Sequence, residues 1–122
     1  MVPAPTSNPT LVAGGLIGLW QGDNGSFYLL IAGQFSDQGI WKWDQVLARV
    51  ESTPAKQGRW RIYGDDFFLQ DVTGKDLCPL RQEGPYHAHL VADTLTLKRG
   101  GDQCSARVTR TEGQYTRLAA AP

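Results

Sequence analysis

Hydrophobic and polar residues alternate along most of the chain, which is the pattern of strands that have one buried face. In the segment 59–63, for example, Trp60 and Ile62 share one side, and the intervening positions share the other. No segment keeps an apolar repeat of 3.6 residues over about eleven positions, the length at which such a repeat indicates an amphipathic helix. The pattern therefore predicts an all-β protein.

Turn residues divide the alternating pattern into nine predicted strands. Asn24 and Gly25 favour a hairpin turn because both tolerate a positive φ, and Gly64 separates two further strands. Short strands spaced about ten residues apart are typical of a β-sandwich or a closed up-and-down barrel, and closure leaves no exposed strand edge. The predicted strands cover residues 16–21, 26–31, 40–44, 46–51, 59–63, 67–71, 86–90, 94–98 and 111–118.

The register of the hairpin at residues 86–98 follows from its apolar positions. The two strands share an inward face only if the loop between them, around residues 91–93, contains two or four residues. That register places His87 and His89 together on the outside. The inward side chains are then Tyr86, Ala88, Leu90, Leu95 and Leu97.

Two cysteines are predicted to pair. Continued backward, the hairpin register places Cys78 opposite a position next to Cys104. Cross-strand neighbours are close enough for a disulfide, and closing a loop of this length contributes about 3 kcal/mol. The alternative is a pair of reduced, partly buried cysteines in a cytosolic protein. Two cysteines alone do not predict a zinc site.

Length and charge narrow the class of protein. The 122 residues predict one domain, placed at residues 11–122, after a flexible N-terminal lead at residues 1–10 that is rich in Pro, Ser and Thr. Lys and Arg number 12, as do Asp and Glu, so no net field steers the protein toward nucleic acid. No apolar run reaches the roughly 20 residues of a membrane span.

The expected compartment follows from the disulfide and the lead. A disulfide favours an oxidising compartment, and the lead has the composition of a stretch that remains when an export signal is replaced by a starting Met. We therefore expect a periplasmic or secreted protein, with a cytoplasmic location as the alternative.

Two short motifs carry a family resemblance. Gly18 and Trp20 form a Gly-x-Trp at the first predicted strand, and "YTR" at residues 115–117 lies in the last one. This arrangement resembles the lipocalins and the wider calycin superfamily, and the segment 64–107 resembles bacterial lipocalin-like domains. The resemblance implies a single antiparallel up-and-down barrel of about eight strands. It also implies a structural role for Trp20, packed at the closed barrel end beneath Arg117.

The barrel interior is the expected ligand site. An eight-stranded barrel has room for one small ligand, and the chain has four Trp, four Tyr and four Phe. Ala88 stands where the similar bacterial domains often have a Trp, which leaves room inside. Trp41 and Trp43 share one strand face; inward they form a stacking wall, and outward an exposed patch for a partner. The predicted ligand-binding residues, each of which could instead simply fill the core, are Phe27, Leu29, Trp41, Trp43, Trp60, Phe67, Tyr86, Ala88 and Leu95.

Candidates for catalysis are few. Asp65 and Asp66 are most simply turn residues, but as buried acids in an apolar cup they, or Tyr86, are weak candidates for moving a proton. His87 and His89 have the i, i+2 spacing of a metal pair, yet no third ligand is evident. We therefore expect no metal and no cofactor.

Three functions are compatible with these features. The first is binding of a small apolar or aromatic molecule in the cup, with selectivity from polar groups such as Tyr28, Lys42 or Tyr86. The second is a cofactor-independent cyclase or isomerase of a natural-product pathway that uses the same cup. The third is a periplasmic protein inhibitor that inserts its N-terminal lead into a protease. The sequence does not identify the ligand, and it leaves open whether the protein forms a homodimer.

Overall fold

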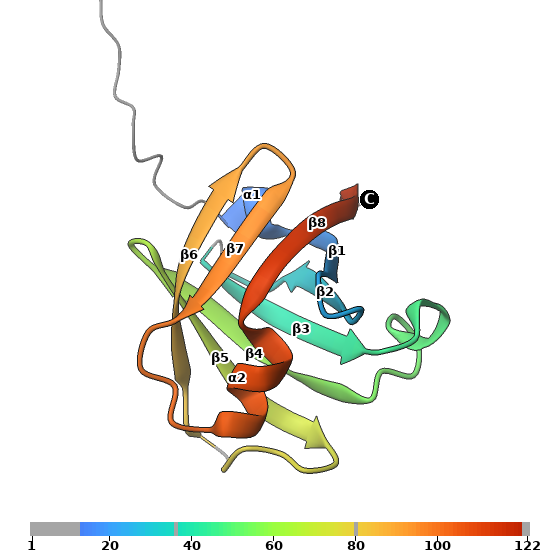
Figure 1. Ribbon diagram of the computed structural model, residues 1–122, viewed down its shortest axis with the longest axis vertical. Coiled ribbons are helices and arrows are strands. Elements are labelled where there is room, and N and C mark those ends of the chain that lie inside the picture. The colour runs from blue at the N-terminus through green and yellow to red at the C-terminus, as the bar shows by residue number, and fades with distance from the viewer. Residues whose placement is uncertain (1–12, 36, 80, 121–122) are drawn as a thin grey trace, which may run out of the picture.

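The computed structural model describes residues 13–35, 37–79 and 81–120; the predicted lead at residues 1–10 lies outside these ranges. Eight antiparallel strands close into one up-and-down barrel, in which β1 pairs with both β2 and β8 (Figure 1). The predicted fold class is confirmed. The strands are β1 (Gly18–Gly22), β2 (Phe27–Ala32), β3 (Gln38–Asp44), β4 (Lys56–Tyr63), β5 (Asp66–Gly74), β6 (Gly84–Val91), β7 (Thr94–Arg99) and β8 (Gly113–Ala120).

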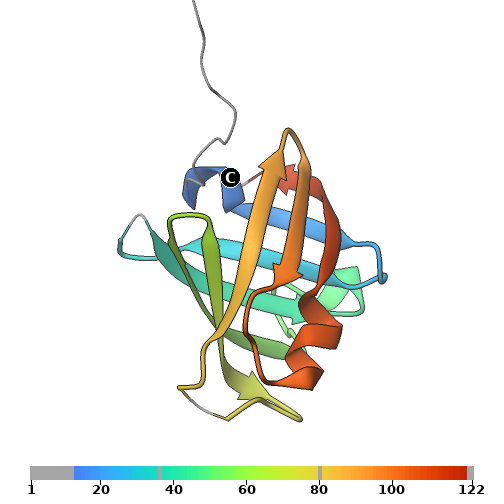
Figure 2. The ribbon, with the colours of Figure 1, turned by 60° about the vertical axis from the view of Figure 1, so that its left-hand side comes forward.

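Two short helices lie at opposite ends of the barrel (Figures 1 and 2). The first, α1 (Ala13–Leu16), precedes β1, and the second, α2 (Ser105–Thr111), connects β7 to β8. The α2 end also contains the β1–β2 turn, where the Asn24 amide donates to the Arg110 carbonyl over 3.2 Å. Neither helix is long and apolar enough to cross a membrane, and the same holds for every helix in the described residues.

The strand predicted at residues 46–51 is wrong. This segment contains a 3-10 turn, η1 (Leu47–Arg49), between β3 and β4. The buried Asp44 carboxylate accepts hydrogen bonds from the backbone amides of Val46, over 2.8 Å, and Ala55, over 3.0 Å. Because one carboxylate ties down both sides of the connection, the chain here forms a compact loop and not a strand.

The predicted register of the β6–β7 hairpin is confirmed. Leu90 lies opposite Leu95, and Val91 lies opposite Thr94, so the loop between the strands contains two residues. His87 and His89 on β6 are both exposed, as predicted for the outer face.

Large indoles fit inside the barrel because glycines lie opposite them. Across β3 and β4, Trp41 pairs with Gly58 and Gly39 pairs with Trp60. A Cβ atom added at Gly58 would lie 2.6 Å from the Trp41 ring and would also collide with the Gln70 carbonyl. The two glycines thus let both indoles lie flat across the neighbouring strand.

Candidate functional site

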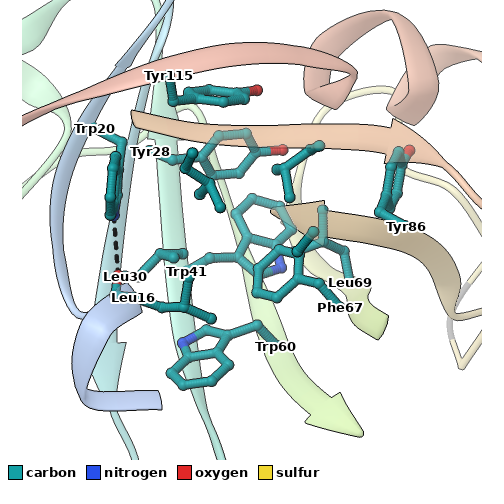
Figure 3. Packing of buried hydrophobic residues seen from close by; sticks show 13 residues of the cluster. Leu16, Trp20, Tyr28, Leu30, Trp41, Trp60, Phe67, Leu69, Tyr86 and Tyr115 are labelled. Atoms are coloured by element: carbon teal, nitrogen blue, oxygen red, sulfur yellow. Dashed lines mark hydrogen bonds between the residues drawn. The ribbon is translucent and has the colours of Figure 1, made fainter. Parts of the chain in front are cut away.

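The barrel interior is filled by side chains. Thirteen buried residues form a single cluster, which includes three indoles and three tyrosines (Figure 3). A cavity between them measures about 10 Å³, close to the space of one water molecule. Ala88 is not among its lining residues.

Six of the predicted ligand-binding residues lie in this cluster, and Trp43 is half-buried against it. The prediction that Phe27 and Leu29 point into the barrel is wrong. Tyr28 and Leu30 of β2 occupy the core, and Phe27 and Leu29 lie on the outer face of the strand. The Tyr28 hydroxyl bonds the Thr111 hydroxyl over 2.8 Å, so the inward position gives it a buried polar partner. The six residues in the core are Trp41, Trp60, Phe67, Tyr86, Ala88 and Leu95.

The α1 end of the barrel is closed by Trp20 and Arg117. The buried Trp20 indole donates to the Leu16 carbonyl over 2.9 Å, and the Arg117 guanidinium carbon lies 4.3 Å from the centre of an indole ring (Figure 3 shows the indole bond). Arg117 also donates to the Ile17 carbonyl over 2.9 Å and to the Gly15 carbonyl. This is the geometry that the lipocalin resemblance implied.

The acids considered for catalysis lie outside the barrel. Asp65 is exposed, and Asp66 is partly exposed and bonds His87 over 3.1 Å. Neither acid is therefore buried in an apolar cup. His89 is exposed, and in the described residues no group of three His, Cys, Asp or Glu side chains is placed to hold a metal ion.

A buried ion pair closes the α2 end. Arg107 of α2 is fully buried and donates two hydrogen bonds to the Asp102 carboxylate, of 2.6 Å and 2.9 Å. Tyr86 donates to the same carboxylate over 2.6 Å, and the Cys104 amide over 3.0 Å. Burial acts to raise the pKa of Asp102, but the bonds from Arg107, Tyr86 and the Cys104 amide hold it below its ordinary value. Burial and the bond to Asp102 raise the pKa of Tyr86, so its hydroxyl stays neutral.

A second buried pair lies beside the first. Arg110 donates to Asp71 over 3.0 Å and to the Tyr28 hydroxyl over 3.1 Å. Its guanidinium carbon lies 5.1 Å from the ring centre of Trp41 and 5.8 Å from that of Trp43, within the range of cation–π attraction. The Arg110 Nη1 atom is buried and has no hydrogen-bond partner among the described residues, and neither has the Trp43 indole nitrogen.

The predicted disulfide between Cys78 and Cys104 is confirmed, but it does not extend the hairpin as predicted. Cys78 lies in the connection between β5 and β6, and Cys104 immediately precedes α2. The Cys78 amide donates to Asp71 over 3.1 Å, and the Cys104 amide donates to Asp102. The bridge therefore joins the two backbone segments that hold the buried carboxylates.

Two adjacent hollows open at this end of the barrel. The first, of about 380 Å³, lies between the β1–β2 turn, the neighbouring ends of β3 and β4, and α2; its lining includes Trp43, Lys56 and Arg110. The second, of about 520 Å³, shares Trp43 and Lys56 with the first. Its lining also includes Arg49 and Lys75. Trp43 thus lines both hollows, and each of them also has cationic side chains in its lining.

The sequence patterns missed the polar residues of this site. Arg107 and Arg110 are three positions apart and lie on the inner face of α2, but this helix has seven residues and its buried face is polar. A search for apolar helical stripes does not detect such a helix. Paired basic residues after Asp102 and Cys104, at helical spacing, are the signal that was available.

The comparisons with known proteins do not assign the chain to a family. No protein-family model, no curated protein and no solved structure matched the chain. The closed barrel and the contact between Trp20 and Arg117 are the features that bear on its family, and the hollow beside Trp43 is the feature that bears on its function.

Proposed function

We propose that this protein binds a small aromatic molecule in the hollow beside Trp43, at the α2 end of the barrel. The observation that carries the proposal is the contrast between two spaces: about 10 Å³ inside the barrel and about 380 Å³ at its mouth. Sites for small molecules measure about 300–1,000 Å³. The mouth has the size of such a site, and the interior does not.

Trp43 is the residue best placed to contact the ligand. It packs against the core cluster on one side and lines both hollows on the other. An aromatic ring held in this way offers a flat apolar surface at little entropic cost, because the side chain is already fixed.

The neutral fluorescent probe phenylnaphthylamine tests this proposal. We expect saturable binding to the wild-type protein, and an affinity about fivefold to tenfold lower in Trp43→Leu, since an aromatic contact contributes about 1 kcal/mol beyond its area. Probe fluorescence measured against protein concentration gives both values.

Tyr63→Leu is the matched control, because Tyr63 is an aromatic residue with 77 % of its surface exposed and lines neither hollow. Its affinity for the probe should equal that of the wild type. An equal loss of affinity in both variants would show that the hollow beside Trp43 is not the site.

We also infer that the barrel is a bacterial lipocalin-like member of the calycin superfamily. Support comes from the Gly-x-Trp at Gly18 and Trp20, from the stacking of Arg117 on the indole, and from the eight-stranded up-and-down topology.

The disulfide supports a periplasmic or secreted location, because such bridges persist in oxidising compartments. The inhibitor alternative depends on residues 1–10, which lie outside the described part of the chain, and it stays a prediction.

A further inference from the structure

We infer that the aromatic ligand carries a negatively charged group, such as a carboxylate or sulfonate, which is held at the hollow by Arg110 and Lys56. This inference rests on the proposed function, because it names the chemical class of the molecule that occupies the same hollow. It follows from one donor of Arg110 and from the balance of charge around the hollow.

Protein partners accept hydrogen bonds from only some of the nitrogen atoms of the Arg110 guanidinium. Nε donates to the Tyr28 hydroxyl, and Nη2 donates to Asp71, whereas Nη1 has no partner among the described residues. Its side chain is only 4 % exposed, and its guanidinium carbon lies 5.1 Å and 5.8 Å from the ring centres of Trp41 and Trp43. A buried donor without a partner costs free energy, which an acceptor on a bound ligand would recover. A charged acceptor makes the strongest such bond.

The carboxylate beside Arg110, that of Asp71, accepts hydrogen bonds from several partners. Asp71 accepts from Arg110 and, over 3.4 Å, from Arg107 through the same oxygen, while its other oxygen accepts the Cys78 amide. Asp102 is already gripped by Arg107. The buried network is therefore neutral, with two arginines and two aspartates, but Arg110 is its least satisfied member.

The surface around the hollow adds further positive charge. Lys56 lines both hollows, and its ammonium donates to the Lys75 carbonyl, an uncharged acceptor. Lys75 lines the second hollow as well. Asp76 is the acidic residue in the lining of the first hollow.

These charges leave the mouth of the barrel positive. In the second hollow, Asp44 is paired with Arg49 over 3.4 Å. In the lining of the two hollows, the negative charge of Asp76 alone then opposes the positive charges of Lys56 and Lys75. The total charge of the chain is zero, so this excess is local. A local excess of this kind favours a ligand with a single negative charge.

A pair of probes with one aromatic body tests the inference. Phenylnaphthylamine is neutral, and anilinonaphthalene sulfonate has the same fused rings with a sulfonate added. We expect the wild-type protein to bind the sulfonate at least about tenfold more tightly, which is the effect of one charge-assisted hydrogen bond. High salt should remove only part of that preference, because salt screens the more exposed lysines more than the buried Arg110. Fluorescence titration of both probes at low and at high salt measures this preference.

Lys56→Gln is the informative variant, and Lys98→Gln, an exposed lysine of β7 that lines neither hollow, is its control. We expect Lys56→Gln to weaken the sulfonate severalfold and the neutral probe by much less, while Lys98→Gln changes neither. Arg110→Lys, which keeps the charge beside Asp71 but lacks Nη1, should weaken the sulfonate more than the neutral probe.

Each contrary result has a separate meaning. Equal affinity for the two probes in the wild type overturns the inference and leaves the proposed function standing. Equal sulfonate affinity in Lys56→Gln and Lys98→Gln also overturns it, because the negative group would then be bound elsewhere. Failure of both probes to bind overturns the proposed function, and the inference with it.

Discussion

At the scale of single residues, this barrel depends on small side chains opposite large ones. Gly58 and Gly39 make space for the indoles of Trp41 and Trp60. Gly84 does the same for a charged group, since a Cβ atom there would collide with the Asp102 carboxylate and lie 2.6 Å from Nε of Arg107. These positions tolerate no added methyl group, because the atoms that they face belong to the backbone or to the buried network.

Gly58→Ala should lower the free energy of unfolding by at least about 2 kcal/mol, because the new methyl group displaces both the Trp41 indole and the Gln70 carbonyl. Gly101→Ala is the control: that glycine is exposed, and its added Cβ would meet only a Pro85 ring carbon, at 3.3 Å. We expect a change within about 0.5 kcal/mol there. Urea unfolding followed by tryptophan fluorescence measures both, and equal stability of the two variants would contradict the packing described.

Single residues also show where the sequence misleads. Alternation assigned the inner face correctly in β4 and β6, where polar residues separate the apolar ones. In β2 every residue from Phe27 to Leu30 is apolar or aromatic, so alternation does not distinguish the two faces. Tyr28 points inward because its hydroxyl meets Thr111 and Arg110 there, partners supplied by a helix 80 or more positions later.

At the scale of elements, α2 closes the barrel with polar contacts. Its buried residues are Arg107, Arg110 and Thr111, where an amphipathic helix normally presents apolar side chains. A helix of seven residues is marginal alone and depends on tertiary contacts. The disulfide at Cys104 and the ion pairs supply these contacts, which explains why local sequence patterns predicted the strands but missed this helix.

Replacement of both cysteines, as Cys78→Ser with Cys104→Ser, should cost about 3 kcal/mol of stability. The bridge closes a loop between positions 26 residues apart, and its loss frees the unfolded chain. Because it also anchors the start of α2, amide hydrogen exchange should accelerate in residues 105–111 more than in β3. A reducing agent should destabilise the wild type equally and leave the double variant unaffected. Wild-type stability in the double variant would contradict this account.

At the scale of the whole molecule, the two barrel ends are closed by different chemistry. The α1 end uses Trp20 under Arg117, whose donors go to backbone carbonyls. The α2 end uses Asp102 and Asp71 with two buried arginines. Two short motifs and the resemblance that they carry were enough to anticipate the first closure, whereas the second joins residues from β5, α2 and the connection between β7 and α2 that only the fold brings together. The open hollows lie at the second end, so the stability of the closure and the proposed binding share the residue Arg110.

This arrangement makes the acid stability of the molecule depend on its α2 end. The pKa of Asp102 is lower in the folded protein than its ordinary value of 3.8, so its charge stabilises the fold above about pH 4. That stabilisation is lost as the pH falls through the lower, folded value. The free energy of unfolding should therefore change little between about pH 7 and pH 5 on this account, and fall steeply below about pH 4.

Asp102→Asn identifies the group responsible. It should cost about 3–5 kcal/mol at neutral pH, because the buried charge of Arg107 is then left with only its 3.4 Å contact to Asp71, which Arg110 already shares. Its loss of stability below about pH 4 should be shallower than in the wild type. Glu83→Gln, which removes the partner of the more exposed Arg61, should reduce the acid slope less, since solvent screens that pair. Urea midpoints measured at intervals from neutral to acid pH give all three slopes. If Asp102→Asn kept the full wild-type slope, the acid sensitivity would reside elsewhere, and the buried pair would not couple the closure of the barrel to pH.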